Sequence, residues 1–265
     1  MKIMLNGIHL AYSDQGHGEP LVFLHAFPLH RAMWEAQVQA FAEAFRVITI
    51  DLRGFGESDA PIWRYSIEQF ADDVHALLDH LSIPRATFVG LSMGGYTLLA
   101  LYRKYRNQIQ ALVLADTRAE ADSEEVRSGR MAMAQTAYHQ GMDAIAEIMI
   151  PKLLGSTSLA SRPNVVQTVR AMIARNQPSG IIGALIAMAD RPDSTALLRE
   201  ITCPTLVIVG EEDIATPPAE VKRMADQIPG ARLEVIPSAG HASNLEQPER
   251  FNQALLSFLQ TMGKS

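Results

Sequence analysis

The feature that most constrains the fold of this sequence is a series of short apolar runs. Longer segments with helical spacing separate them. Such runs are typical of strands covered on both faces, and the segments between them of helices flanking a parallel sheet. Asn6-Gly7 supplies the positive φ angles of a tight turn and predicts a hairpin before them. The expected strands are 2–5, 8–13, 20–25, 46–51, 86–91, 109–115, 204–210 and 231–236. The pattern predicts an α/β protein with a mostly parallel eight-stranded sheet.

Two helices of this framework are predicted with particular clarity. Residues 66–81 place apolar side chains three and four apart, which makes one apolar stripe. Ser66 can cap this helix, with Gln69 at the spacing of a capping box, and Pro84 ends it. A last helix is expected over residues 245–259.

The strand pattern disappears between Thr117 and Arg199, and this stretch is interrupted by glycine and proline. We expect about four helices here, forming a cap over residues 117–199 that is inserted into a core domain of residues 1–116 and 200–265. The cap is rich in alanine and lacks a basic cluster, which predicts a mainly apolar pocket. Its methionines should pack the cap or line that pocket; they are Met131, Met133, Met142, Met149, Met172 and Met188.

Composition excludes several classes of protein. The net charge of −6 gives no basic footprint for nucleic acid. Cys203 is the only cysteine, so neither an intrachain disulfide nor a cysteine-based metal cluster is expected. The N-terminal residues lack the apolar stretch of a signal peptide, and no apolar run is long enough to span a membrane. These features predict a cytoplasmic protein.

A candidate nucleophile lies in the segment Gly90-Leu91-Ser92-Met93-Gly94, which matches the G-x-S-x-G pattern. A strand pattern runs directly into Ser92 and a helical pattern follows it. A strand that turns straight into a helix exposes the serine and needs small residues two positions before and after it, because the backbones approach closely there. We therefore expect Ser92 to be a nucleophile. The alternative is a purely structural role, in which Ser92 caps a helix beside a glycine turn.

A serine hydroxyl needs a neighbouring base, and His241 is the candidate among eight histidines. It lies in the loop between the last strand and the last helix, and Gly240 would give that loop freedom to aim the ring. Loops at the carboxyl ends of parallel strands gather at one edge of the sheet. The other histidines fall in helices, in the cap or in the N-terminal hairpin, apart from those after the third strand.

The expected acid is Asp213, which follows the strand at 204–210 and would hydrogen-bond the imidazole. Its rival is Asp116, at the end of the strand that follows the nucleophile helix. Two backbone N–H groups should stabilise the negative charge that develops on a carbonyl oxygen. They are assigned to Met93, directly after the nucleophile, and to Phe27, in the loop after the third strand. His25 is expected to brace this loop.

Five segments together resemble the α/β-hydrolase superfamily over essentially the whole chain: LHAFPLHRAMW, DLRGFGESD, VGLSMGGYTLLAL, LVIVGEEDIATPP and SAGHASNLEQPERF. They look most like the branch of small carboxylesterases, 3-oxoadipate enol-lactonases and cofactor-free haloperoxidase-type perhydrolases. Ala26 departs from that pattern, because many relatives have glycine there and a methyl group could narrow the loop of Phe27.

The resemblance implies the α/β-hydrolase fold with Ser92, Asp213 and His241 as its triad, and no catalytic role is assigned to Asp51 or Arg53. It implies cleavage of a small-molecule ester or lactone without a metal or organic cofactor. A carboxylesterase is the first expectation and an enol-lactone hydrolase the alternative. C–C bond hydrolysis uses the same triad, and a slow ligand-sensing protein on this fold is a further alternative.

Overall fold

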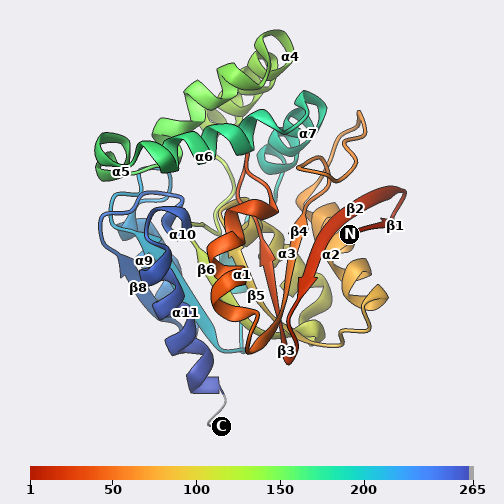
Figure 1. Cartoon of the computed structure of the whole chain (residues 1–265), viewed down its shortest axis with the longest axis vertical. Helices are drawn as coiled ribbons and strands as arrows, with labels where there is room; N and C mark the ends of the chain where they lie inside the picture. The colour runs from red at the N-terminus through yellow and green to blue at the C-terminus, as the bar shows by residue number, and fades with distance from the viewer. Residues whose placement is uncertain (263–265) are drawn as a thin grey trace.

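The computed structural model describes residues 1–262 and contains one sheet of eight strands (Figure 1). Their order across the sheet is β1-β2-β4-β3-β5-β6-β7-β8. Among these eight strands β2 runs opposite to the other seven, so its two pairings are antiparallel and the other five are parallel, which confirms the predicted mostly parallel sheet. The strands are β1 (Lys2–Leu5), β2 (Ile8–Gln15), β3 (Glu19–Leu24), β4 (Phe45–Asp51), β5 (Ala86–Leu91), β6 (Ile109–Ala115), β7 (Thr205–Gly210) and β8 (Arg232–Ile236).

The pairing register aligns the carboxyl ends of the central strands. Leu24 at the end of β3 pairs with Gly90 of β5, and Gly90 pairs with Leu114 of β6. At the other side of the sheet, Gly210 at the end of β7 pairs with Ile236 at the end of β8. The loops that follow these strands therefore leave from the same edge, where a site can be built from segments far apart in the sequence.

Helices cover both faces of the sheet, and every residue of β5 and of β7 is buried. Figure 1 shows α1 and α11 in front of the sheet and α3 behind it. In α2, Ser66 Oγ accepts a hydrogen bond from Gln69 N at 3.0 Å, which confirms the predicted cap and contributes about 1 kcal/mol. These helices are η1 (Arg31–Trp34), α1 (Glu35–Phe41), α2 (Ile67–His80), α3 (Met93–Tyr105), η2 (Arg106–Gln108), α9 (Pro218–Ala225), α10 (Ser243–Glu246) and α11 (Pro248–Met262).

The single helix predicted over residues 245–259 is wrong, because α10 and α11 are separate. Gln247 interrupts them with φ −135° and ψ 63°. The following Pro248 disfavours the helical region for the residue before it, yet fits the first position of a new helix. The break matters for the site, because α10 directly follows the loop that carries His241.

Five helices connect β6 to β7, where the sequence predicted about four. They are α4 (Glu124–Leu153), α5 (Ser156–Ser161), α6 (Pro163–Ala174), α7 (Pro178–Ala189) and α8 (Thr195–Leu198). Figure 1 shows α4, α5, α6 and α7 beyond one end of the sheet. α4 is kinked at Gly141, whose φ of 77° is not helical. Across residues 1–262, no helix combines the length and apolar character needed to cross a membrane.

Candidate active site

Ser92 lies at the turn between β5 and α3, as the sequence predicts. Its backbone has φ 55° and ψ −111°, a left-handed conformation that non-glycine residues rarely adopt. The surroundings hold it there: Ser92 N donates to Ala115 O at 2.9 Å, and Thr117 Oγ1 donates to Ser92 O at 2.8 Å. The neighbouring strand β6 and its loop thus fix the serine backbone in a strained conformation.

The glycines beside Ser92 are required by close packing. A Cβ on Gly90 would lie 2.6 Å from the backbone of Gly94, and a Cβ on Gly94 would lie 2.3 Å from Leu24 O. Both distances are far below van der Waals contact. The tight turn therefore requires a residue without a side chain at positions 90 and 94, which agrees with the sequence-based reason for the motif.

The structure brings Asp213 and His241 together. Asp213 follows β7, His241 follows β8, and His241 Nδ1 lies 2.8 Å from Asp213 Oδ2. The other oxygen, Oδ1, accepts from Ala215 N at 2.8 Å and Thr216 N at 2.9 Å, while Thr216 Oγ1 donates to Oδ2 at 2.5 Å. These bonds hold the carboxylate in one orientation, so that it can accept the Nδ1 proton and leave Nε2 free as a base.

The environment of this pair favours its charged forms. Burial alone would raise the pKa of Asp213, but His241 and the hydrogen bonds from Thr216 outweigh it and hold that pKa below its ordinary value. Burial alone would lower the pKa of His241, but the charge and hydrogen bond of Asp213 raise it above the ordinary 6.5. The carboxylate therefore stabilises an imidazolium at position 241.

Asp116, the rival acid, makes different contacts. Its Oδ1 accepts from Gly210 N at 2.8 Å and its Oδ2 from Ser243 Oγ at 2.5 Å. Burial, followed by repulsion from Asp213, raises the pKa of Asp116 well above its ordinary value. Asp116 thus joins the ends of β6 and β7 to α10, while Asp213 holds the imidazole.

Ser92 and His241 line the same cavity, which has a volume of about 510 Å³. Both residues are largely buried, with 8% and 5% of their surfaces exposed. Within residues 1–262 no hydrogen bond joins Ser92 Oγ to the His241 ring. Such contacts are often long in ligand-free enzymes and shorten when substrate binds. The nucleophile and base expected from sequence therefore line one pocket, and the expected acid is hydrogen-bonded to the ring of that base.

The two predicted oxyanion donors are placed differently: one lines this pocket, and the other directly follows Ser92 in the chain. Met93 is the first residue of α3, so its N–H has no partner within the helix, and Phe27 lines the cavity beside Ser92. His25 braces the Phe27 loop as expected, because Leu52 N donates to His25 Nε2 at 3.0 Å and Nδ1 donates to Ala26 O at 3.0 Å. Burial lowers the pKa of His25 to about 4, so the ring is neutral at physiological pH.

The cavity wall is more basic than the sequence indicated. Three methionines line it, as the predicted apolar pocket requires, but so do charged side chains. The lining includes Met133, Met149 and Met188, the cationic Arg118, Arg130 and Lys152, and the acidic Asp122 and Glu125. The cationic residues are spread over 35 positions in the chain, so no cluster is visible in the sequence. The fold of α4 and the loop after β6 brings them to one cavity.

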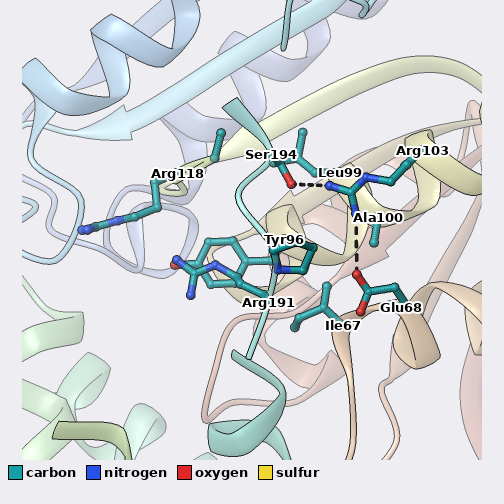
Figure 2. A pocket seen from close by; sticks show the side chains of 11 residues that line it. Ile67, Glu68, Tyr96, Leu99, Ala100, Arg103, Arg118, Arg191 and Ser194 are labelled. Atoms are coloured by element: carbon teal, nitrogen blue, oxygen red, sulfur yellow. Dashed lines mark hydrogen bonds and ion pairs between the residues drawn. The ribbon is translucent and has the colours of Figure 1, made fainter. Parts of the chain in front are cut away.

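One carboxylate of this wall is shared by two guanidinium groups. Arg130 donates to both oxygens of Asp122, and Arg191 Nη1 donates to Asp122 Oδ1 at 2.6 Å. Arg191 also stacks on the ring of Tyr96 at 4.1 Å, as Figure 2 shows. Tyr96 lies one helical turn after Ser92 and lines the cavity. The wall therefore carries three cationic side chains against two acidic ones, Asp122 and Glu125, an excess of one positive charge.

Comparison with known proteins gives consistent matches over nearly the full chain. The sequence profile described as alpha/beta hydrolase fold matches residues 19–248. The 3-oxoadipate enol-lactonase 2 of Acinetobacter baylyi is 32% identical over 250 residues, covering 94% of this chain and 92% of that protein.

Two solved structures are similar in both sequence and shape. A thermophilic esterase from Thermogutta terrifontis, solved with malate bound, is 43% identical with a TM-score of 0.95, and 98% of each chain is covered. The enol-lactonase from Burkholderia xenovorans LB400 is 33% identical with a TM-score of 0.92, covering 98% of this chain and 100% of that one.

Proposed function

Because this chain belongs to the α/β hydrolase fold family, we propose that it is a serine hydrolase that cleaves small carboxylic esters through an acyl-enzyme. The observation that carries the proposal is the convergence of three loops. Ser92, on its strained turn, shares a cavity with His241, whose Nδ1 is bonded to Asp213. The test is turnover of p-nitrophenyl acetate and of esters and lactones of graded size. Absence of turnover on all of them would overturn the proposal.

In the first half of the reaction, His241 Nε2 takes the hydroxyl proton of Ser92 as Oγ attacks the ester carbonyl. The N–H groups of Phe27 and Met93 stabilise the oxyanion, and Asp213 stabilises the imidazolium. The imidazolium then gives its proton to the departing alcohol, leaving an acyl group on Ser92. In the second half, His241 activates a water molecule that releases the acid and restores Ser92.

We propose that residues 117–199 act as a cap that selects the substrate. This role is supported by the cavity, whose wall above Ser92 comes largely from α4, through Val126, Met133 and Met149. Methionine side chains adapt to irregular apolar ligands, which suits acyl or alcohol groups of small size.

A second candidate is hydrolysis of an enol-lactone, and the basic wall favours it when the substrate carries a carboxylate. Arg118, Arg130 and Lys152 line the same cavity as Ser92. The two enol-lactonases among the compared proteins support this alternative, as does the esterase solved with malate, an anion. Both candidates use one triad: with an ester the alcohol departs as a separate molecule, whereas with a lactone the released oxygen stays attached to the acyl chain.

The basic wall predicts a preference for anionic esters. Mono-p-nitrophenyl succinate carries a carboxylate, and p-nitrophenyl isocaproate is a neutral ester of similar shape. At low ionic strength kcat/KM should be about tenfold higher for the succinate, because a hydrogen-bonded ion pair contributes about 1.5–3 kcal/mol. The preference should shrink as salt screens the partly exposed cations. Equal rates for the two esters at low salt would contradict a carboxylate-binding role of this wall.

The raised pKa of His241 predicts the acid limb of the pH–rate profile. The base must be neutral to accept a proton, so activity is lost when His241 is protonated. Since Asp213 raises the pKa of His241 above 6.5, kcat/KM should rise with pH through an apparent pKa above that value. The measurement is kcat/KM on p-nitrophenyl acetate between pH 5 and 9, roughly the range in which a histidine titrates. A limb lying below 6.5 would disagree with the charge of Asp213 at this site.

A further inference from the structure

The carboxylate of Glu246 joins the loop of His241 to the helices that connect β6 and β7. Glu246 lies at the end of α10 and is only 3% exposed. Its Oε1 accepts from Gly240 N, the residue before His241, at 2.8 Å. Its Oε2 accepts from Gly155 N, between α4 and α5, at 2.9 Å. One buried side chain therefore holds two backbone segments together.

The residue on the other side of His241 is bonded to the same connection. Ala242 N donates to Leu153 O at 2.8 Å, and Leu153 lines the cavity that contains Ser92. The guanidinium of Arg162, which follows α5, donates to the backbone oxygen of Glu246. Both neighbours of His241 are thus fixed, one directly and one through Glu246, to residues 153–155.

The two segments pack backbone against backbone. A Cβ on Gly240 would lie 2.3 Å from Gly155 N, and a Cβ on Gly155 would lie 2.9 Å from Gly240 N. Gly240 is therefore needed for this close approach, whereas the sequence suggested that it frees the loop to aim the ring. Such packing leaves the histidine loop little room to shift while the Glu246 bonds are intact.

We infer that Glu246 is a positioning residue, which fixes the loop of His241 against residues 153–155 so that the imidazole is aimed at Ser92. The inference rests on the proposed function, in which His241 is the base. The position of residues 153–155 and the orientation of the His241 ring are then coupled through the same contacts. The same contact places Leu153 in the cavity wall and the ring at the reacting centre.

A carboxylate is suited to this place because both of its oxygens face N–H donors. Glutamine has the same shape but only one acceptor oxygen, so its NH₂ group would face Gly155 N or Gly240 N and one bond would be lost. Buried donors left without a partner are unfavourable, so the two segments should separate. Aspartate keeps the charge but is one methylene shorter and cannot reach both groups at once.

Glu212 provides a matched control, because it also binds the helical connection without contacting the neighbours of His241 through its side chain. Its carboxylate accepts from Thr157 N at 2.9 Å and from Ser156 Oγ at 3.1 Å. Unlike Glu246, it is partly exposed. Removing either charge loosens one attachment of α5, but only Glu246 supports the residue before the imidazole.

The experiment compares Glu246→Gln, Glu246→Asp and Glu212→Gln in the full chain on p-nitrophenyl acetate. A misplaced base slows both acylation and deacylation, so kcat of Glu246→Gln should fall by about 10–100-fold with KM changed less than about threefold. Glu212→Gln should keep both constants near those of the parent. The one-dimensional proton spectrum supplies a readout independent of turnover: the downfield Nδ1–H signal of His241 should shift or broaden in Glu246→Gln and persist in Glu212→Gln.

Three results would overturn the inference. The first is equal loss of kcat in Glu246→Gln and Glu212→Gln, and the second is a rise in KM with kcat retained, which would mark a role in substrate binding alone. The third is an unchanged Nδ1–H signal in Glu246→Gln. If that variant does not fold, Glu246→Asp decides by the same kcat and proton criteria. A parent chain without esterase or lactonase activity would refute the proposed function, whereas the proton signal still tests the positioning.

Discussion

Ser92→Ala should lower kcat on p-nitrophenyl acetate by about 10⁶-fold, the scale seen when a serine nucleophile is removed. Alanine keeps the backbone bonds of residue 92 to Ala115 and Thr117, because these involve only main-chain atoms of residue 92. The variant should therefore fold with an unchanged Tm. The measurements are initial rates, the pre-steady-state burst of p-nitrophenol, which should vanish, and thermal unfolding.

A second variant controls for a thiol contribution. Cys203 is the only cysteine and precedes β7, at the opposite edge of the sheet from the loops of Asp213 and His241. Cys203→Ala should keep the activity of the parent. Retention of near-normal turnover in Ser92→Ala, or loss of turnover in Cys203→Ala, would contradict the assignment of the nucleophile.

Asp213→Asn should lower kcat by about 10⁴-fold, as expected when the acid of such a triad is replaced. An asparagine NH₂ group can turn toward Nδ1 and donate to it, which stabilises the tautomer whose proton lies on Nε2. In that tautomer Nε2 cannot accept the proton of Ser92. It also removes the negative charge that stabilises the imidazolium. The measurement is kcat with KM on p-nitrophenyl acetate, together with Tm.

Asp116→Asn is the paired comparison, because Asp116 is a buried carboxylate whose charge also acts on the His241 ring. It accepts hydrogen bonds from Gly210 N and Ser243 Oγ, so its replacement should lower Tm while kcat changes far less than in Asp213→Asn. If Asp116→Asn were instead as inactive as Asp213→Asn while still folded, the choice of Asp213 as the acid would be wrong.

The sheet could be predicted from sequence because buried parallel strands are short, apolar and separated by longer helices. All eight strands lie where the apolar runs placed them, although β2 extends to Gln15 through pairing with Val47 of β4. The helices were less predictable at their ends. The break at Gln247 depends on a single backbone conformation within otherwise helical sequence, whereas the kink of α4 lies at Gly141, one of the glycines expected to interrupt that stretch.

The candidate triad could be assembled from sequence because parallel strands bring their carboxyl ends to one edge. Ser92, Asp213 and His241 each follow such a strand, and the structure brings Asp213 to His241 and His241 to the cavity of Ser92. Asp213 was expected over Asp116 from the sequence, and the contacts distinguish the two: Asp213 is bonded to the His241 ring, and Asp116 to Gly210 N and Ser243 Oγ. The two aspartates follow neighbouring strands, and what separates their roles is the set of hydrogen-bond partners of each side chain.

The contacts made by residues 117–199 were not predictable in this way. Arg118, Arg130 and Lys152 share a wall because α4 and the loop after β6 line the same cavity. The segment SAGHASNLEQPERF contains Glu246, but nothing in the sequence indicates that its partner is Gly155, 91 positions away. Local sequence patterns predict helices, strands and where these end. Contacts between residues 117–199 and the rest of the chain depend on how the two parts pack, which local patterns do not encode.

The left-handed backbone conformation of Ser92 affects which substitutions are favourable as this sequence evolves. A left-handed conformation at a residue with a side chain is unfavourable by about 1–3 kcal/mol, and glycine would relieve it. Mutations selected only for thermal stability would thus favour loss of the hydroxyl at the one position where chemistry needs it. Retaining serine there means that the rest of the fold must supply a surplus of stability, which the buried central strands around the turn are suited to provide.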